Sequence, residues 1–366
     1  MKKILFVATV DIHIINFHLH IIQSLKQLGN KVDVAANGSF CNGDIHRKYD
    51  VCFSKNPLSF DNIKAFFKIK KIIKENHYDI ISCHTPLSSF FTRLAVGDDS
   101  QTKVMYTAHG FHFFKGASWI NQLVYKNMEK IAARYTDVLV TINQEDYQSS
   151  LNFRLKKDGK CVYIPGIGVD IERIANITFD EDKLKQELNI EEDDFLILSV
   201  GELNNNKNHL FVMETLLAEF KSNQKLKYYI CGVGPNHACY EKFIQDNNLQ
   251  EQIKLLGYRE DIYQIYHLAN LFIFPSKREG LPVSLIEAMA AGLIPIVTNV
   301  RGNRDVVENG KTGFIIEVGD SQALLNDYKK IKNQFINLQQ MKTDSYDSLS
   351  LYHIKKIESK ILSLYQ

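Results

Sequence analysis

No apolar run in this sequence of 366 residues approaches the roughly 20 residues that a membrane-spanning helix needs. The opening segment is mainly apolar from Ile4 to Val10, a run of only seven residues, and no small-residue cleavage site follows it. A secretory signal peptide would carry such a site after its apolar region. We therefore expect residues 3–10 to form the first buried parallel strand.

No two of the six cysteines stand in C-x-x-C spacing, and most of them lie within apolar runs. This pattern is typical of reduced core residues in a cytoplasmic protein. The six are Cys41, Cys52, Cys83, Cys161, Cys231 and Cys239.

The sequence has little net charge, +2 overall, but the charge is unevenly distributed. Residues 1–172 carry 22 Lys and Arg against 16 Asp and Glu, which gives +6, and the remainder carries 22 against 26, which gives −4. A basic N-terminal half predicts an anionic surface or acceptor on that side. The surplus is modest, and we predict no nucleic-acid partner.

Short β-type runs alternate with helical patterns along nearly the whole chain, which is typical of parallel sheets with crossover helices. The first series has expected strands at 3–10, 31–36, 79–84, 102–108, 137–142 and 160–164, and helices near 15–29, 61–76, 86–97 and 119–135. The second has strands near 195–200, 226–231, 252–256, 271–274, 294–297 and 313–316, and helices near 207–221, 261–268, 283–291 and 320–332. We predict two doubly wound α/β units in tandem, with ligands at the carboxyl ends of strands in the cleft between them.

The segment S-K-R-E-G-L-P-V-S-L-I-E-A-M-A-A-G, residues 276–292, carries the most information about chemistry. It follows an expected strand and reads as a tight loop, with Pro282 in the first turn of a helix. The amides of Gly280 and Leu281 at that helix N-terminus could hold a phosphate group. The carboxylates of Glu279 and Glu287 could each accept hydrogen bonds from vicinal sugar hydroxyls. Together they suggest a nucleotide-sugar site.

This segment resembles the E-x7-E signature of retaining glycosyltransferases of family 4. Those enzymes have the GT-B fold, in which two Rossmann-like domains face each other across a cleft. The runs T-A-H-G-F-H-F-F-K-G, A-R-Y-T-D-V-L-V-T-I-N and P-S-K-R-E-G-L-P are similar to bacterial surface-polysaccharide enzymes of capsule, exopolysaccharide and O-antigen synthesis. The resemblance implies an acceptor-side domain over residues 1–172 and a nucleotide-sugar-binding domain over 173–344. It also implies that a C-terminal amphipathic helix, residues 345–366, packs back on the first domain.

In the second domain, the resemblance implies that Lys207 neutralises the diphosphate leaving group, where a fixed cation lowers the barrier. A solvated lysine at a helix start is the alternative. The family usually has arginine where this chain has Glu202, and a carboxylate beside a diphosphate is repulsive. Either Glu202 points away or Arg278 or Arg259 supplies the missing cation. Arg259 could lie beside the nucleotide base or serve the structure, and Asp261 is expected to cap the following helix.

In the first domain, His109 matches the histidine that approaches the donor sugar in the family, and a neutral imidazole could hydrogen-bond a hydroxyl or the β-phosphate. His112 is structural or faces the acceptor, and His84 either faces the acceptor or caps a helix. Residues 9–18 are expected to form a loop, which lacks the glycines typical of the family. We therefore expect that loop to meet the acceptor, through Asp11 and His13.

We predict no metal site. The D-x-D at Asp180-Glu181-Asp182 reads as a helix start, where acidic side chains are favoured. Six histidines sit on different elements without metal-ligand spacing. These are His13, His18, His20, His84, His109 and His112.

Residues 62–77 carry five lysines among phenylalanines and isoleucines. A basic amphipathic helix can lie on anionic lipid, or it can be a crossover helix with one core face and one solvated face. The protein would then be cytoplasmic and peripheral on the inner face of the cell membrane.

The function implied is retaining, metal-independent transfer of a hexose or N-acetylhexosamine from a nucleotide-sugar, with UDP as the expected nucleotide. The expected acceptor is a saccharide linked to polyprenyl diphosphate, and no cofactor is expected besides the donor. No residue stands out as a covalent nucleophile, so front-face substitution fits better than double displacement. Two alternatives stay open: a UDP-sugar 2-epimerase of the same fold, and a weakly active nucleotide-sugar-binding partner subunit.

Overall fold

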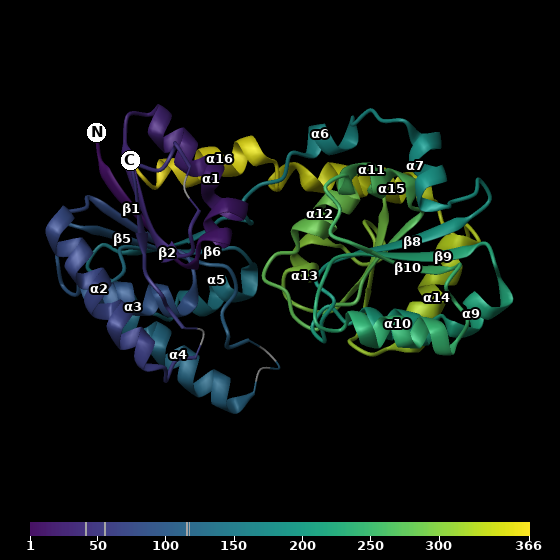
Figure 1. Ribbon diagram of the computed structural model, residues 1–366, viewed down its shortest axis with the longest axis horizontal. Coiled ribbons are helices and arrows are strands. Elements are labelled where there is room, and N and C mark those ends of the chain that lie inside the picture. Colours follow the sequence, from purple (N-terminus) through teal and green to yellow (C-terminus); the bar gives the residue numbers. More distant parts are fainter. Residues whose placement is uncertain (41, 55, 115, 117) are drawn as a thin grey trace. The chain divides into compact units, whose positions relative to one another are not determined.

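The computed structural model describes residues 1–40, 42–54, 56–114, 116 and 118–366. The chain divides into two compact units. The first comprises Met1–Gly168 together with Lys355–Gln366, and the second comprises Val169–Ile354. We call them the N-terminal and C-terminal domains (Figure 1).

The N-terminal domain is built on a seven-stranded parallel sheet with the order β3-β2-β1-β4-β5-β6-β7. Its strands are β1 (Lys3–Val10), β2 (Lys31–Asn37), β3 (Arg47–Asp50), β4 (Ile80–Cys83), β5 (Lys103–Ala108), β6 (Val138–Thr141) and β7 (Lys160–Tyr163). Both faces are covered by helices, which is why the inner strands, such as β1 and β4, are mostly apolar and buried, whereas the edge strand β3 is polar. The edge strand β3 was not expected from the sequence.

Side chains that alternate along β1 enter two cores. Leu5 and Val7 pack with α2 (Phe60–Asn76), α3 (Pro86–Val96) and α4 (Trp119–Ala133). Ile4 and Phe6 pack on the other face with α1 (Asp11–Gln27) and α16 (Ile354–Ser363). A further helix, α5 (Gln144–Ser150), follows β6.

The C-terminal domain contains a six-stranded parallel sheet with the order β10-β9-β8-β11-β12-β13. The strands are β8 (Phe195–Val200), β9 (Leu226–Cys231), β10 (Ile253–Gly257), β11 (Leu271–Phe274), β12 (Ile294–Thr298) and β13 (Phe314–Ile316). The helices are α6 (Ile171–Ala175), α7 (Glu181–Leu188), α8 (His209–Thr215), α9 (Leu217–Ser222), α10 (His237–Asp246), α11 (Ile262–Leu268), α12 (Val283–Ala290), α13 (Asn303–Val306), α14 (Ser321–Lys332) and α15 (Leu338–Ser348), with a 3-10 turn at Leu349–Leu351. The predicted class, two doubly wound α/β units, is confirmed.

Three local expectations were wrong. The expected loop at 9–18 does not exist, because β1 runs directly into α1 at Asp11. The helix expected at 207–221 is divided into α8 and α9 at Leu216. The expected C-terminal helix is interrupted after Leu351, where Val169 donates to the Tyr352 carbonyl and accepts from the Ile354 amide. Only the part after this break, α16, packs on the N-terminal sheet.

The cysteines only partly follow the prediction. Cys83 and Cys231 are buried, but Cys52 and Cys239 are exposed, and Cys41 lies outside the described residues. Among the described residues, no helix combines the length and apolar character required to cross a membrane.

Candidate active site

The loop between β11 and α12 carries the paired carboxylates of the E-x7-E segment. Pro282 is the N-cap residue of α12, one position before the helix, and its restricted φ suits this entry. The carbonyl of Glu279 accepts a hydrogen bond from Arg301 Nε at 3.0 Å. A Cβ on Gly302 would lie 2.5 Å from the Gly280 carbonyl oxygen, so only glycine allows this approach. The segment that follows β12 therefore holds this loop in place, through Arg301 and Gly302.

Lys207 and Glu279 form an ion pair with 2.7 Å between Nζ and Oε1. Their side chains are 20% and 11% exposed, so the pair is largely withdrawn from water. The Lys207 stem lies against Gly201, since a Cβ there would be 3.1 Å from its Cδ, and the ammonium lies 4.5 Å from the centre of the Phe274 ring. The structure thus brings together two residues that lie far apart in the sequence.

Asparagines that the sequence interpretation did not assign hold this arrangement in place. The Asn204 side-chain oxygen accepts from the backbone amides of Asn206 and Lys207, both at 2.9 Å. Asn206 donates through its side chain to the Arg278 carbonyl at 3.0 Å, and its own carbonyl accepts from the Lys277 amide. The loop after β8 and the loop after β11 therefore form one unit. The run of three asparagines at 204–206 is typical of a turn, so this loop could have been found from the sequence.

Beside this unit lies a cavity of about 370 Å³ in the C-terminal domain. Its lining includes Gly201, Glu202, Gly232, Val233, Tyr258, Arg259 and Glu287. The cavity opens at the carboxyl ends of β8, β9 and β10, where ligands bind in doubly wound sheets.

Glu287 contributes a carboxylate to this cavity from the second turn of α12. Tyr266 donates to its Oε2 at 3.1 Å, and Tyr263 donates to its Oε1 at 3.4 Å. Burial raises the pKa of this carboxyl above its ordinary value, and the two tyrosine hydrogen bonds oppose that rise. Each oxygen retains a lone pair for a ligand hydroxyl. Both tyrosines lie in α11 and were missed, because core aromatics give no separate sequence signal.

Asp261 behaves differently from the prediction, whereas Arg259 is compatible with both of its predicted roles. Asp261 stands at the N-cap of α11 but accepts no capping hydrogen bond there. Its carboxylate instead accepts two bonds from Arg259, at 2.7 and 2.6 Å, and the same guanidinium also reaches Glu187 at 2.9 Å. The guanidinium holds the pKa of the Asp261 carboxyl below its usual range. Arg259 lines the cavity, but its charge is already neutralised by two carboxylates.

Glu202 and Arg278 are both exposed. Glu202 Oε2 accepts from the side-chain amide of Asn204 at 2.8 Å, which links it to the loop that positions Lys207. Glu202 therefore has a structural partner at the position where the family usually has arginine.

In the N-terminal domain, the predicted residues lie at the carboxyl ends of β1, β4 and β5. Asp11 opens α1 and accepts from the Phe40 amide at 2.8 Å, which commits it to holding the segment after β2. His84 is buried, and its Nε2 hydrogen-bonds Ser82 Oγ at 3.0 Å. His112 packs against Tyr125, with ring centres 4.8 Å apart.

His109 lies beside His13, at 4.7 Å between ring centres, and His18 and His84 adjoin them. The expectation that the histidines sit on different elements without metal-ligand spacing is therefore wrong here, because His13 and His18 share α1 and one ring nitrogen from each of His13, His18 and His109 lies within 4.8 Å of the others. Asp180, by contrast, caps α7 as expected, by accepting from the Lys183 amide at 3.0 Å.

Two doubly wound parallel-sheet domains, with the E-x7-E pair on the loop and helix that follow β11, define a glycosyltransferase of the GT-B type. The family model described as glycosyl transferases group 1 matches residues 180–347, and that described as glycosyl transferase 4-like matches residues 3–143. The chain is 36% identical over 325 residues to the putative glycosyltransferase EpsD of Bacillus subtilis, with 88% of this chain and 85% of EpsD covered. The chain belongs to the group 1, or family 4, glycosyltransferases.

Two further relatives are informative. A UDP-Gal:α-D-GlcNAc-diphosphoundecaprenol α-1,3-galactosyltransferase of Escherichia coli is 29% identical over 315 residues, covering 85% of this chain and 81% of that protein. The crystal structure of Anabaena HepE in complex with UDP superposes with a TM-score of 0.77 at 17% identity, over 100% of this chain and 99% of that one. At this low sequence identity, the similarity to HepE establishes the fold alone.

Proposed function

We propose that this glycosyltransferase moves a hexose or N-acetylhexosamine from a UDP-sugar to a saccharide linked to polyprenyl diphosphate, in the synthesis of a surface polysaccharide. The observation that carries the proposal is the cavity of about 370 Å³ lined by Glu287, next to the Lys207–Glu279 pair. The E. coli relative's name specifies a UDP-sugar donor and a diphosphoundecaprenol-linked acceptor, and the HepE structure contains UDP. Both support the choice of substrates.

The donor would be held by groups of the C-terminal domain. Glu287 would accept hydrogen bonds from the two ribose hydroxyls, and Glu279 from hydroxyls of the transferred sugar. The backbone amides of Gly280 and Leu281, at the N-terminus of α12, and the Lys207 ammonium would bind the diphosphate. Lys207 has three N–H donors, so it could keep its bond to Glu279 while contacting a phosphate oxygen.

The chemical step would be a front-face substitution with retention of configuration. The bond between the anomeric carbon and the β-phosphate oxygen breaks while the acceptor hydroxyl oxygen bonds to that carbon from the same face. The acceptor's proton passes to the departing phosphate oxygen. Lys207 and the loop amides would stabilise the charge that develops on the diphosphate, and no metal ion would be required. His109 would hydrogen-bond the donor sugar as a neutral imidazole, since burial lowers its pKa to about 3.

On the acceptor side, Asp11 and His84 are less suited than the other candidates to direct contact with the acceptor. The Asp11 carboxylate binds the Phe40 amide, and His84 is buried, so both would act by positioning their neighbours. His13 and His112 would then face the acceptor saccharide.

Arg259 and Arg278 complete the proposed donor site. Two carboxylates already pair with the Arg259 guanidinium, so Arg259 would not act as a free cation. It would contact the nucleotide through the methylene groups of its side chain and through the edge of the guanidinium that faces the nucleobase. Arg278 would place its exposed side chain near the diphosphate, and Glu202 would act through Asn204.

The N-terminal domain also carries a surface suited to a membrane-bound acceptor. Helix α2 packs into the core through Ala65, Ile69 and Ile72, as a crossover helix would. Its outer side and that of α4 expose large apolar side chains beside exposed lysines. We call this the α2–α4 surface; its members are Leu58, Phe60, Ile63, Phe67, Trp119, Ile120, Leu123 and Val124, with Lys64, Lys68, Lys71 and Lys74.

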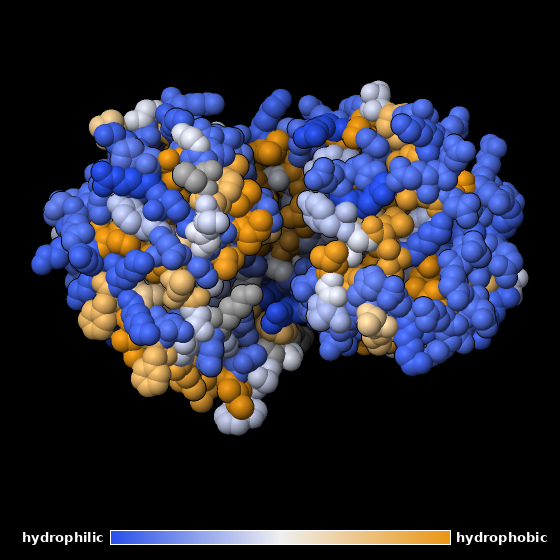
Figure 2. Space-filling model, viewed as in Figure 1, coloured by the Kyte–Doolittle hydropathy of each residue, from blue (hydrophilic) through white to orange (hydrophobic). Residues whose placement is uncertain are grey.

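Figure 2 shows apolar side chains gathered over this region, at the lower left. Apolar side chains that insert into a bilayer and lysines that attract anionic lipid bind membranes together. The enzyme would therefore work as a peripheral protein on the inner face of the cell membrane, where lipid-linked acceptors are assembled.

Saturation-transfer NMR tests the donor assignment. Wild type, Glu287→Ala and the matched control Glu241→Ala, which changes an exposed glutamate of α10, would be compared with a panel of UDP- and GDP-sugars. We expect one UDP-sugar to show transfer to ribose and sugar protons in wild type and control, and none in Glu287→Ala. If no donor binds, or if Glu287→Ala binds equally well, the proposed donor site is wrong.

A further inference from the structure

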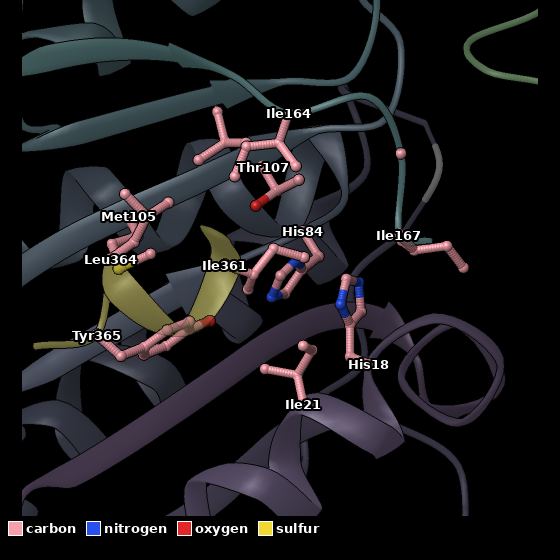
Figure 3. A pocket seen from close by; sticks show the side chains of 12 residues that line it. His18, Ile21, His84, Met105, Thr107, Ile164, Ile167, Ile361, Leu364 and Tyr365 are labelled. Carbon is pink, nitrogen blue, oxygen red and sulfur yellow. The ribbon is translucent and has the colours of Figure 1, made fainter. Parts of the chain in front are cut away.

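Four histidines of the N-terminal domain are gathered at one place by three different elements. His13 and His18 lie on α1, His84 follows β4, and His109 follows β5. The ring centres of His18 and His84 are 3.7 Å apart, and those of His13 and His109 are 4.7 Å apart. Figure 3 shows His18 and His84 side by side at the wall of a small cavity. Such a grouping of a scarce, polar residue type calls for a chemical explanation.

Each of these histidines has a buried ring nitrogen without a hydrogen-bond partner. These atoms are Nε2 of His13, Nε2 of His18, Nδ1 of His84 and Nε2 of His109. A buried polar atom that lacks a partner costs about 1–3 kcal/mol. Four such nitrogens in one cluster therefore lower the stability of the fold, and a ligand that binds to them could offset that loss of free energy.

The imidazoles present lone pairs rather than charges. Burial lowers the pKa of His13 to about 4 and that of His109 to about 3. The pKa values of His18 and His84 lie well below the ordinary value, first because of burial and then because of repulsion from the neighbouring histidines. Neutral imidazole is the form that binds metal ions.

The arrangement fits a tetrahedral metal ion. One ring nitrogen from each of His13, His18 and His109 lies within 4.8 Å of the others. An imidazole bound at about 2.1 Å places its ring centre about 3.2 Å from the ion, so three in tetrahedral positions have centres about 5 Å apart. The observed separations are 4.7 Å for His13–His109 and 5.3 Å for both His13–His18 and His18–His109.

The nitrogens must still approach to about 3.4 Å for tetrahedral binding. Small rotations of the side chains would achieve this. A cavity of about 20 Å³ adjoins His18 and His84, and it leaves the His18 ring room to turn. His84 is anchored on the side away from His18, because its Nε2 lies 3.0 Å from Ser82 Oγ, which is 2.7 Å from the Tyr365 hydroxyl oxygen.

We propose that His13, His18 and His109 form a binding site for a transition-metal ion of the zinc type, with His84 packed against His18. The cluster that would bind the ion offers only imidazole nitrogens, which suit Zn²⁺, Co²⁺, Ni²⁺ and Cu²⁺ rather than Mg²⁺ or Ca²⁺. Three protein ligands leave a fourth position for water or a substrate oxygen.

The ion would also regulate transfer. A bound metal ion would fix the His109 ring within the cluster, so Zn²⁺ should inhibit the reaction by keeping that ring from adjusting to the donor sugar. Donor binding through Glu287, in the other domain, should persist. This consequence rests on the proposed function, whereas metal binding itself does not, so the two can fail separately.

The test uses the full chain without a histidine tag, freed of metal by chelator and titrated with Co²⁺ and Zn²⁺. We expect one Co²⁺ per chain with the absorption of a four-coordinate ion, displaced by one Zn²⁺. His13→Ala, the least buried of the three ligands, and His18→Ala should weaken binding by more than about 10-fold, the lower bound set by the loss of supporting groups around metal sites. The matched control is His20→Ala, on the same helix but outside the cluster, and it should bind like wild type.

Absence of stoichiometric binding by folded wild type would overturn the proposal. So would equal affinity of wild type and the folded His13→Ala variant, or a loss in His20→Ala as large as in His13→Ala. Circular dichroism establishes folding. X-ray absorption of the Zn²⁺-loaded wild type needs no variant: three imidazole ligands support the site, and a carboxylate or thiolate shell refutes it.

Discussion

Replacing Glu287 by glutamine should improve the stability of this protein while impairing its binding of the donor. The side chain is largely buried, and its carboxylate accepts hydrogen bonds from Tyr266 and Tyr263 at 3.1 and 3.4 Å. Glutamine has the same shape and keeps one acceptor oxygen for the tyrosines, but it carries no charge. The substitution therefore separates the charge from the packing.

The effect on stability follows from the pKa of the carboxyl, which burial raises above its ordinary value in the folded protein. A group with a raised folded pKa stabilises the fold fully at pH below its unfolded pKa, and loses that contribution as the pH rises through the folded pKa. The wild type loses this contribution as the pH rises, whereas glutamine never ionises. Glu287→Gln should therefore have the higher Tm at pH 7, and the difference should shrink as the pH falls through the folded pKa of the Glu287 carboxyl toward its unfolded pKa.

The effect on donor binding has the opposite sign. A hydrogen bond to a charged group contributes about 1.5–3 kcal/mol, and glutamine would lose one of two ribose bonds and weaken the other. We expect a loss of about 2–4 kcal/mol, which corresponds to a rise of about 30- to 1,000-fold in the Kd for UDP.

Calorimetric titration with UDP measures the affinity, and thermal unfolding from pH 4 to pH 8 measures the stability. Glu241→Gln, on the exposed side of α10, is the matched control for both. Unchanged affinity in Glu287→Gln would show that this carboxylate does not bind the ribose. A lower Tm than wild type at pH 7 would show that the carboxylate is stabilised by its tyrosine partners more than it is penalised by burial.

Three further substitutions test other parts of the site. Glu202→Arg should lower kcat/KM because it removes the acceptor for Asn204, whereas Glu202→Gln should stay near wild type; a gain in Glu202→Arg would instead indicate a degenerate, weakly active enzyme. Lys207→Met keeps the apolar stem over Phe274 but removes the charge, and should lower kcat by about 10²–10³-fold with a soluble acceptor analogue; an unchanged kcat would exclude Lys207 from stabilising the leaving group. Phe67→Asp should reduce sedimentation with vesicles containing anionic lipid and leave binding to neutral vesicles at its low wild-type level. If the variant and the wild type sediment equally with anionic vesicles, α2 does not contact the membrane.

Much of the fold follows from local patterns in the sequence. Continuous apolar runs such as Ile4–Val7 and Leu271–Phe274 identify buried parallel strands, because both faces of a doubly wound sheet are covered. The loop before α12 is equally local, since Pro282 and Gly280, two residues earlier, favour a turn that enters the helix. The C-terminal break was not predictable in this way: the segment after Leu351 keeps a helical pattern, but long-range bonds to Val169 interrupt the helix.

The sequence by itself determined the two doubly wound domains, the loop that enters α12 and the Glu279–Glu287 spacing, because strands, turns and helix entries depend on neighbours in the chain. Only the tertiary structure decided which charges are already paired: Arg259 is neutralised by Asp261 and Glu187. It alone brought His109 beside the histidines of α1, at the edge where parallel strands end. The physical reason is that pairing and desolvation depend on atoms that meet through the fold, and residues dozens of positions apart carry no local sign of that meeting.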